Sequence, residues 1–186
     1  MSEMLLGDGA ALEATVRSAA TGDQAAFAHL VAAHHASMAR VAFVICGDAE
    51  TTLDAVQSAW AIAWRRMGSL RDPSQVRPWL VAIAANEARQ IVRRQRRERV
   101  VDISEFVAIE GGYPDVSSEV VDLDRALRGL KADERSLLAM RYAAGLDSSE
   151  IARQMGMSAS GVRSRLARLL ERLREDLALE PETDNG

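Results

Sequence analysis

Apolar residues recur at three- and four-residue steps along most of the chain, which is the spacing of an amphipathic helix. Between residues 23 and 46 the recurring positions are Phe27, Leu30, Val31, His34, Met38, Val41 and Ile45. Gly22 and Asp23 before this stretch and Gly47 after it are typical signals for a helix start and stop. No alternation of period two is long enough for a sheet strand. The pattern therefore predicts an all-α fold.

The next helix is expected from about Asp48 to Met67. Its apolar stripe is expected to contain Leu53, Val56, Trp60, Ala63, Trp64 and Met67. The face expected to point outward consists of Asp54, Gln57, Ser58, Ala61 and Arg65. The proline- and turn-rich residues 68–78 predict a loop. A long helix, apolar at first and then rich in arginine, is expected from about Trp79 to Arg99.

The second half of the chain predicts further helices over residues 119–130, 133–143 and 148–155, and a long one from Ser158 to about Leu177. The segment SSEIARQMGMSASGVRSRLARL indicates a helix-turn-helix. Ala152 is small where two helices approach, and Gly156 can end the first helix in a left-handed conformation. Ser158 can cap the second helix, and Val162 returns it to the shared core. An ordinary helical hairpin uses similar residues and is the alternative.

The outer face of the last helix favours DNA binding over a plain hairpin. Ser160, Ser164, Ala167 and Arg168 lie opposite the apolar side, Arg163 and Arg165 flank them, and Ser158 precedes them. The first acidic residue of this helix is Glu171. Small side chains let a helix lie deep in a major groove, and arginine donates to guanine edges or to phosphates. The face therefore predicts a DNA-reading helix.

Arginines crowd the end of the long helix in the first half. Six occur within eleven residues, namely Arg89, Arg93, Arg94, Arg96, Arg97 and Arg99. A solvated helix terminus explains two or three such charges, whereas six repel one another and favour a polyanionic partner. Trp79, just before this helix, could stack on an unpaired base, but its spacing with Ile83 favours a place in the core.

The charge of the chain is distributed in blocks. The 186 residues carry a net charge of −4, but residues 65–99 hold ten arginines against three acids. Residues 100–124 hold seven acids and no basic residue, and residues 125–177 hold eleven basic residues against seven acids. This pattern indicates two basic modules joined by an acidic linker. We expect a cytoplasmic protein with no membrane insertion, since no signal sequence is evident and the apolar stretches fall short of the ~20 residues that a span needs.

Little in the sequence suggests catalysis or a cofactor. The single cysteine, Cys46, has no partner for an internal disulfide and cannot build a metal site alone. His29 and His34 lie ~140° apart around one helix, so they do not converge on a metal. No glycine-rich phosphate loop and no nucleophile–base pair stands out. We therefore expect no enzyme activity, no metal and no cofactor.

Two long segments carry a family resemblance. TTLDAVQSAWAIAWRRMGSLRDPSQVRPWLVAIAANEARQIVRRQRR resembles the sigma-2 domain of bacterial sigma factors, and LKADERSLLAMRYAAGLDSSEIARQMGMSASGVRSRLARLLERLREDL resembles sigma-4. Together they resemble the small two-domain extracytoplasmic-function (ECF) class. The resemblance implies a sigma-2 domain at residues 21–99, an acidic, flexible linker at 100–119, a sigma-4 domain at 120–178 and a tail at 179–186. Residues 1–20 fall outside the family pattern, as a disordered tail or a short extra helix.

The resemblance implies a sigma factor that binds core RNA polymerase through the β′ clamp and the β flap and directs promoter-specific initiation. The β′ clamp contact is implied for Asp54, Gln57, Ser58, Ala61 and Arg65. Contact with the −10 element is implied for Arg71, Arg77, Asn86, Arg89, Arg93, Arg94, Arg96 and Arg97, with a flipped base held by the 68–78 loop. Reading of the −35 duplex is implied for Ser158, Ser160, Arg163, Ser164, Arg165, Ala167 and Arg168.

The resemblance also implies an anti-sigma factor as a partner, which would mask these surfaces. The alternative function is a stand-alone helix-turn-helix regulator that binds duplex DNA without polymerase. That alternative accounts for residues 120–178 but leaves the arginine cluster of the first module unexplained.

Overall fold

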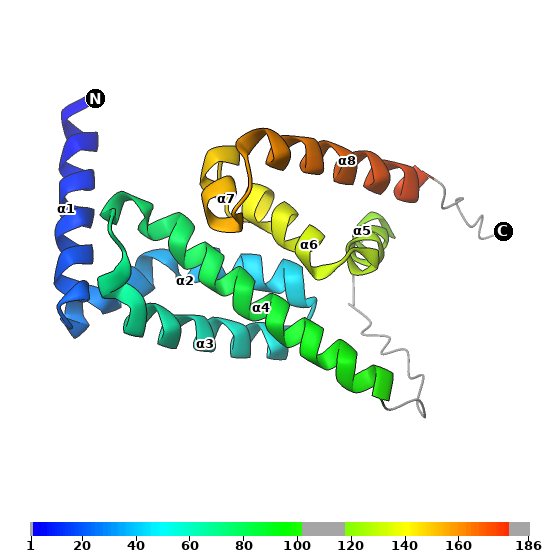
Figure 1. The fold of residues 1–186 in the computed structure, drawn as a ribbon, viewed down its shortest axis with the longest axis horizontal. Coiled ribbons are helices and arrows are strands. Elements are labelled where there is room, and N and C mark those ends of the chain that lie inside the picture. Colours follow the sequence, from blue (N-terminus) through cyan, green and yellow to red (C-terminus); the bar gives the residue numbers. More distant parts are fainter. Residues whose placement is uncertain (1, 102–117, 179–186) are drawn as a thin grey trace.

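The computed structural model describes residues 2–101 and 118–178, which are helical with short connections (Figure 1). The elements are α1 (Ser2–Ala20), α2 (Gln24–Cys46), α3 (Ala49–Arg66), the 3₁₀ turns η1 (Met67–Ser69) and η2 (Pro73–Gln75), α4 (Val76–Val101), α5 (Ser118–Gly129), α6 (Ala132–Leu138), the π-helical turn η3 (Ala139–Ala143), α7 (Ser148–Met155) and α8 (Ala159–Ala178). The all-α prediction is confirmed. Residues 102–117 of the predicted acidic linker and the predicted tail at 179–186 lie outside the described residues.

Helices α2 and α3 begin at the aspartates that the sequence marks. Asp23 Oδ1 accepts hydrogen bonds from the backbone N–H groups of Ala25 at 2.9 Å and Ala26 at 3.1 Å. Asp48 Oδ1 accepts one from the Thr51 N–H at 2.8 Å. Such caps satisfy backbone donors that have no partner inside the helix. Gly47 ends α2 with a φ of 82°, a left-handed conformation that glycine adopts without strain.

The buried side of α3 differs from the predicted stripe. Its buried row runs through the small residues Ala55, Ala59 and Ala63, which lets α3 pack closely against its neighbours. Leu53 was wrongly placed in this stripe, because it lies ~160° around the helix from Ala55 and is 65% exposed. Trp64, also assigned to the stripe, is 37% exposed, although its ring meets that of Phe27 edge-on at 4.9 Å.

Helix α4 begins at Val76, three residues earlier than predicted. Pro78 therefore lies in its first turn rather than in the loop. Proline is tolerated there because the first four N–H groups of a helix have no intrahelical acceptor. The connection between α3 and α4, called the α3–α4 loop below, is thus residues 67–75 and contains η1 and η2.

The two predicted modules share one apolar core. A first cluster joins helices α1 to α4 through residues such as Leu30, Met38 and Leu80. A second cluster joins α2, α3 and α4 to the second module, and it includes Ile45 and Leu137. Figure 1 shows α6, α7 and α8 lying along the bundle of α2, α3 and α4. The charge pattern predicted two modules on a linker but not that they pack together.

The N-terminal segment is a helix rather than a tail. Helix α1 stands upright at one end of the bundle (Figure 1). Val16 and Ala19 on its inner side are each 2% exposed. Of the two alternatives for residues 1–20, the structure therefore has the extra helix.

Helix α2 corrects one expectation about membranes. Its 23 residues are long and apolar enough, by length and composition alone, to cross a membrane, contrary to the expectation that every apolar stretch is too short. Central helices of soluble bundles meet the same criterion. Helix α2 contacts α1, α3 and α4 and buries Leu30, Met38 and Val41 among the core residues, so one side of this helix belongs to the core.

Candidate nucleic-acid interface

Helices α7 and α8 form the predicted helix-turn-helix, with the predicted signals at the turn. Asp147 Oδ1 accepts hydrogen bonds from the N–H groups of Ser149 at 2.7 Å and Glu150 at 2.8 Å. The bond from Glu150 is the largest of the effects that hold the pKa of Asp147 below its ordinary value. Gly156 ends α7 with a φ of 64°, and Ser158 Oγ accepts from the Gly161 N–H at 3.0 Å at the start of α8. These contacts fix the angle at which α8 leaves the turn.

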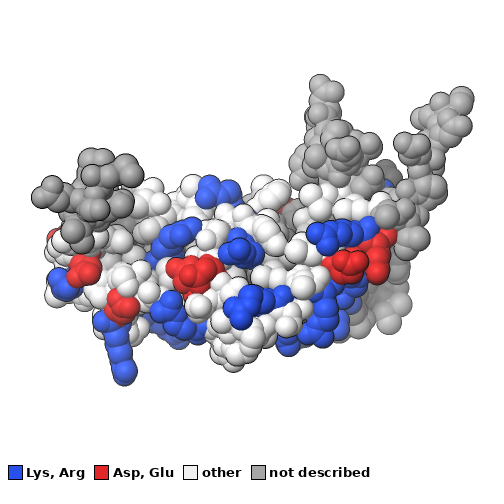
Figure 2. All heavy atoms as spheres, turned by 90° about the horizontal axis from the view of Figure 1, so that it is seen from above, with Lys and Arg blue, Asp and Glu red and all other residues white. Residues whose placement is uncertain are grey.

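Helix α8 buries one side and exposes the other. Val162 is fully buried, and Leu166 and Leu169 are 6% exposed. The outward residues predicted for DNA reading are all exposed, namely Ser158, Ser160, Arg163, Ser164, Arg165, Ala167 and Arg168. The Arg168 Nε–H donates to the Ser164 carbonyl at 3.3 Å, so this guanidinium lies along its own helix. Figure 2 shows basic side chains spread over the face of the molecule seen from above, with smaller acidic groups between them.

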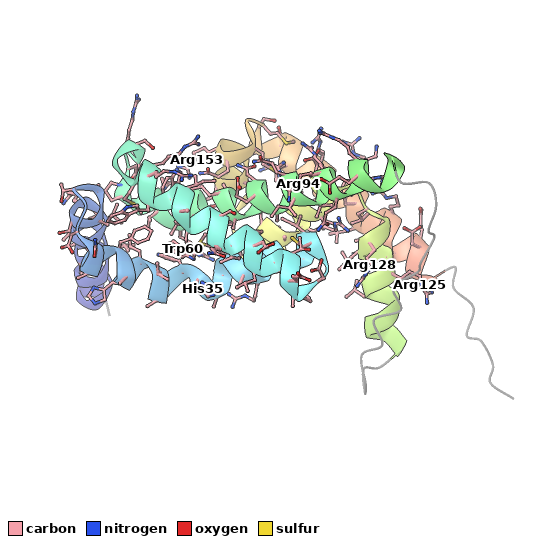
Figure 3. All side chains as sticks on the ribbon, turned by 90° about the horizontal axis from the view of Figure 1, so that it is seen from below. His35, Trp60, Arg94, Arg125, Arg128 and Arg153 are labelled. Atoms are coloured by element: carbon pink, nitrogen blue, oxygen red, sulfur yellow. The ribbon has the colours of Figure 1, made fainter. Side chains whose placement is uncertain are left out.

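Helix α4 exposes part of its predicted arginine cluster. Arg94, Arg96 and Arg97 are exposed, and Figure 3 labels Arg94 on α4. Arg94 pairs with Glu98 of the same helix at 3.8 Å, with both side chains largely in solvent. Such an exposed pair contributes little stability. Arg94 can therefore leave Glu98 and bind a phosphate at little cost in free energy.

Other members of the cluster instead contact the second module. Arg89 Nη1 lies 2.9 Å from Asp133 Oδ1, and Arg93 Nη2 lies 2.6 Å from Asp133 Oδ2. Arg77 also reaches the second module, where it donates to the Ala144 carbonyl. The exposed Asn86 accepts a hydrogen bond from Arg89. We call the contacts of Arg89 and Arg93 with Asp133 the Asp133 clasp. No local pattern predicts it, because the partners are 44 and 40 residues apart.

Asp133 also borders an open hollow of about 440 Å³ between α6 and α8. Its charged lining consists of Lys131, Asp133, Glu134, Arg165, Arg168 and Arg172. Glu134 pairs there with Arg172 at 2.9 Å. The Asp133 carboxylate therefore lies between the arginines of α4 and those of α8.

The outer face of α3 contains the five residues that the sequence predicted and, in addition, Leu53. Asp54, Gln57, Ser58, Ala61 and Arg65 are exposed. Leu53 continues the row of Gln57 and Ala61 at four-residue steps, and it is exposed as well. A single exposed leucine is common on protein surfaces and does not by itself mark a binding face, so Leu53 adds apolar area to this face without identifying its partner. Four-residue spacing was the signal that could have identified it.

The tryptophan and histidine side chains considered as possible functional groups lie within or beside the apolar core. Trp79 packs against the first apolar cluster, as predicted. His35 Nδ1 accepts a hydrogen bond from Trp60 Nε1 at 3.3 Å, between α2 and α3 (Figure 3). Burial, and then the charge of Arg77, lower the pKa of His34, so its imidazole is neutral. Within the described residues, no group of three or more His, Cys, Asp or Glu side chains could hold a metal ion.

Comparison with known proteins agrees with this division into two modules. The model for sigma-70 region 2 matches residues 30–98, and the model for sigma-70, region 4 matches residues 121–173. The ECF RNA polymerase sigma factor SigL of Mycobacterium tuberculosis is 31% identical over 170 residues, which cover 87% of this chain and 94% of SigL. The probable RNA polymerase sigma factor RfaY of Xanthomonas campestris pv. campestris is 30% identical over 168 residues, but these span only 42% of its length and 86% of this chain.

A solved structure shares the whole arrangement. The structure of CnrH in complex with the cytosolic domain of CnrY aligns with a TM-score of 0.70 and 25% sequence identity, and it covers 91% of this chain and 98% of that chain. The similarity therefore extends over both modules and not over the helix-turn-helix alone.

Proposed function

The chain belongs to the sigma-70 family of RNA polymerase sigma factors, in its ECF class, and from this premise we propose how its surfaces direct promoter-specific initiation. Sigma factors are initiation factors rather than enzymes, and we assign this chain no reaction of its own. The observation that carries the proposal is that one chain presents two arginine-bearing helices, α4 and α8, one on each module. A single helix-turn-helix would account for α8 only.

Helix α8 is the element that we assign to the −35 duplex. Its outward face has small residues at Ser160, Ser164 and Ala167, so the helix axis can approach the bases closely. Arg163, Arg165 and Arg168 project from the same and adjacent positions. Arginine donates two parallel hydrogen bonds to a guanine edge or to a phosphate. Of these three arginines, Arg168 lies farthest around the helix from the buried residues Val162, Leu166 and Leu169, and we therefore assign it to base reading.

Helix α4 and the α3–α4 loop are the elements that we assign to the −10 element. Arg94, Arg96 and Arg97 are exposed and would bind the DNA backbone, while Arg71 belongs to the loop that would hold a flipped base. Arg77, Asn86, Arg89 and Arg93 complete the set. For Arg89 and Arg93 to reach phosphate, the Asp133 clasp must open. Promoter binding through this face therefore requires the second module to move away from α4.

The outer face of α3 is the surface that we assign to core RNA polymerase, on the β′ clamp. Asp54 provides a charge, and Leu53 provides apolar area beside it. The β flap would bind the second module. We expect the protein in the cytoplasm, since its class consists of soluble initiation factors.

An anti-sigma factor is the regulatory partner that we propose. CnrH, whose fold this chain shares at a TM-score of 0.70, is bound to the cytosolic domain of a second protein, CnrY. A comparable partner that holds the two modules together would keep the Asp133 clasp closed, with Arg89 and Arg93 paired to Asp133 rather than to DNA.

Reconstitution with core RNA polymerase tests the function against the stand-alone regulator. The purified chain is mixed with core enzyme and a random promoter library, and the transcribed sequences are collected. We expect co-purification with core and enrichment of two separated sequence motifs. A chain that neither binds core nor supports initiation at any sequence contradicts the proposal, and duplex binding alone would favour the regulator.

A matched pair of charge reversals tests the α3 face. Asp54→Lys should weaken binding to core RNA polymerase, whereas Glu98→Lys, at an exposed acid on α4, should leave it unchanged. Both variants change the net charge equally, so a general electrostatic effect would appear in both. Equal affinities of the two variants for core would remove α3 as the docking face.

A further inference from the structure

Helix α1 has no part in any contact assigned above. The match to sigma-70 region 2 begins only at residue 30, beyond α1. Even so, α1 is firmly attached to the bundle, because Val16 and Ala19 are each 2% exposed. Burying a valine removes apolar area from water and stabilises the contact. Helix α1 is therefore held in a fixed position on the bundle, and the surface that it covers is informative about its role.

Helix α1 packs on α2 and also covers the base of the α3–α4 loop. Val16 and Ala19 belong to the same apolar cluster as Met67 at the start of this loop and Val76 just after it. Leu12 of α1 and Leu70 of the loop are partly buried against that cluster. Helix α1 contacts both 3₁₀ turns of the loop, η1 and η2, and Figure 1 shows it beside the connection between α3 and α4.

The backbones of α1 and the loop also approach each other directly. A Cβ atom placed on Gly68 would lie 3.7 Å from the Ala20 carbonyl oxygen, which is ordinary van der Waals contact. The end of α1 thus lies close to the backbone of η1, with room for no more than about one methyl group between them. A shift of α1 would shift the base of the loop with it, because packed groups transmit displacement.

The tip of the loop is held by its own hydrogen bonds. Asp72 Oδ1 accepts from the Ser74 N–H at 3.0 Å and from the Ser74 hydroxyl at 2.7 Å. Asp72 and Ser74 are exposed, and so is Arg71. The tip of the loop is therefore held by local hydrogen bonds, its base packs against α1, and its polar side chains face solvent.

We propose that α1 is a brace that sets the position of the α3–α4 loop and so determines how strictly this loop selects a base of the −10 element. Val16 and Ala19 are positioning residues: they belong to the apolar cluster at the base of the loop and are too deeply buried to reach DNA. This inference rests on the proposed function of the loop. Its physical basis is that a hydrogen-bonding pocket distinguishes one nucleobase from another only when its groups are held in place. A loop that is held less firmly therefore accepts the wrong nucleobase more readily.

The test compares two valines that are equally buried. Val16→Ala removes methyl groups beneath the loop, whereas Val56→Ala makes the same truncation on α3, in the apolar cluster that contains no loop residue. Both valines are 2% exposed. Each full-length variant is bound to core RNA polymerase, and open-complex formation is measured on promoters that carry each of the four bases at the flipped position of the −10 element.

Val16→Ala should lower the discrimination between the preferred base and the other three by about three- to tenfold, because the loop groups that select the base are held less precisely. Val56→Ala should leave this ratio unchanged, and both variants should keep wild-type affinity for core polymerase and for −35 duplex. Equal ratios in the two variants would overturn the brace. So would a wild-type protein that initiates without base preference at this position.

A second pair covers the case in which Val16→Ala does not fold. Ala19→Gly and Ala55→Gly are smaller truncations of buried alanines in α1 and α3, and the same comparison of ratios applies. Failure of the brace and failure of the proposed function are distinguishable. A wild-type chain that initiates nowhere rejects the function, whereas one that initiates selectively with an unaltered Ala19→Gly ratio rejects only the brace.

Discussion

At the scale of single residues, the outward face of α8 provides the most direct test of base reading. Replacing Arg168 by alanine should weaken binding to the −35 duplex by ~1–3 kcal/mol if its guanidinium contacts a base. The loss should be concentrated at one base pair, as measured by fluorescence anisotropy on duplexes that are substituted position by position. Arg174→Ala is the matched control, since Arg174 lies farther along α8 and pairs with Glu171 at 3.3 Å. Equal losses in both variants would contradict a base-reading role for Arg168.

The raised pKa of the Cys46 thiol predicts how its reactivity and the stability of the fold depend on pH. Burial, with a smaller contribution from the charge of Asp48, raises the pKa of Cys46 to about 11 from its ordinary value of 9.0. At pH 8 the folded protein should therefore react with iodoacetamide far more slowly than the urea-unfolded chain, because the thiolate is the nucleophile. The free energy of unfolding should fall as the pH rises from 9 to 11, since the unfolded chain ionises this thiol first. Equal alkylation rates at pH 8 would show that the thiol is not shielded.

Residues whose role depends on one helix were predictable, and residues whose role depends on contacts across the fold were not. The exposure of Arg163, Ser164 and Arg168 follows from helical spacing alone. Hydrophobicity alone predicts a core position for Leu53, but its position relative to Ala55, Ala59 and Ala63 puts it on the other side of α3. Small residues carry a weak hydrophobic signal, yet they mark the closest helix contacts in α3.

At the scale of elements, helix ends followed from local chemistry. Asp23, Asp48 and Ser158 cap the helices that the sequence assigned to them, because a cap involves only a few neighbouring residues. The start of α4 was misplaced because proline is compatible both with a loop and with a first helical turn. The position of α1 against the α3–α4 loop depends on residues far apart in the chain, such as Ala19 and Met67, which no local pattern encodes.

The turn of the helix-turn-helix can be tested through its glycine. Gly156 has a φ of 64°, a region that a residue with a Cβ enters only at a cost, so Gly156→Ala should lower the free energy of unfolding by ~1–2 kcal/mol. Gly129→Ala is the control, because no atom lies within 4 Å of its added Cβ and its φ is not positive. Denaturation with urea measures both variants. A Gly156→Ala variant as stable as Gly129→Ala would show that the turn adopts another conformation.

At the scale of the whole molecule, the packing of the two modules was beyond the reach of the sequence. Charge blocks indicated two modules and a linker, but the shared core depends on Ile45 and Val41 of α2 meeting Leu137 and Leu166 of the second module. A pattern of apolar positions shows which face of a helix is buried and not what covers it. The same holds for the Asp133 clasp, which joins groups far apart in the chain.

The clasp predicts that the isolated protein restrains its own binding to single-stranded DNA. Asp133→Asn removes the charge that holds Arg89 and Arg93, so these arginines become available to phosphate. Arg93 and Asp133 are about half exposed and Arg89 is partly buried, and ion pairs open to solvent are worth up to about 1 kcal/mol each. The affinity of the free chain for a single-stranded −10 oligonucleotide should therefore rise about two- to fivefold. The gain should shrink as salt is added, because ions screen the same charges.

Glu98→Gln separates opening of the clasp from a change in net charge. It removes one negative charge from the same arginine-rich helix, but Glu98 pairs with Arg94 within α4 and does not join the modules. If the clasp restrains binding, Asp133→Asn should raise the affinity more than Glu98→Gln and should also increase the radius of gyration in small-angle X-ray scattering. Equal affinities and unchanged dimensions would mean that the Asp133 contacts are incidental. The closed arrangement would then have to depend on the shared apolar core alone, and opening would be controlled by Ile45 and Leu137 rather than by charge.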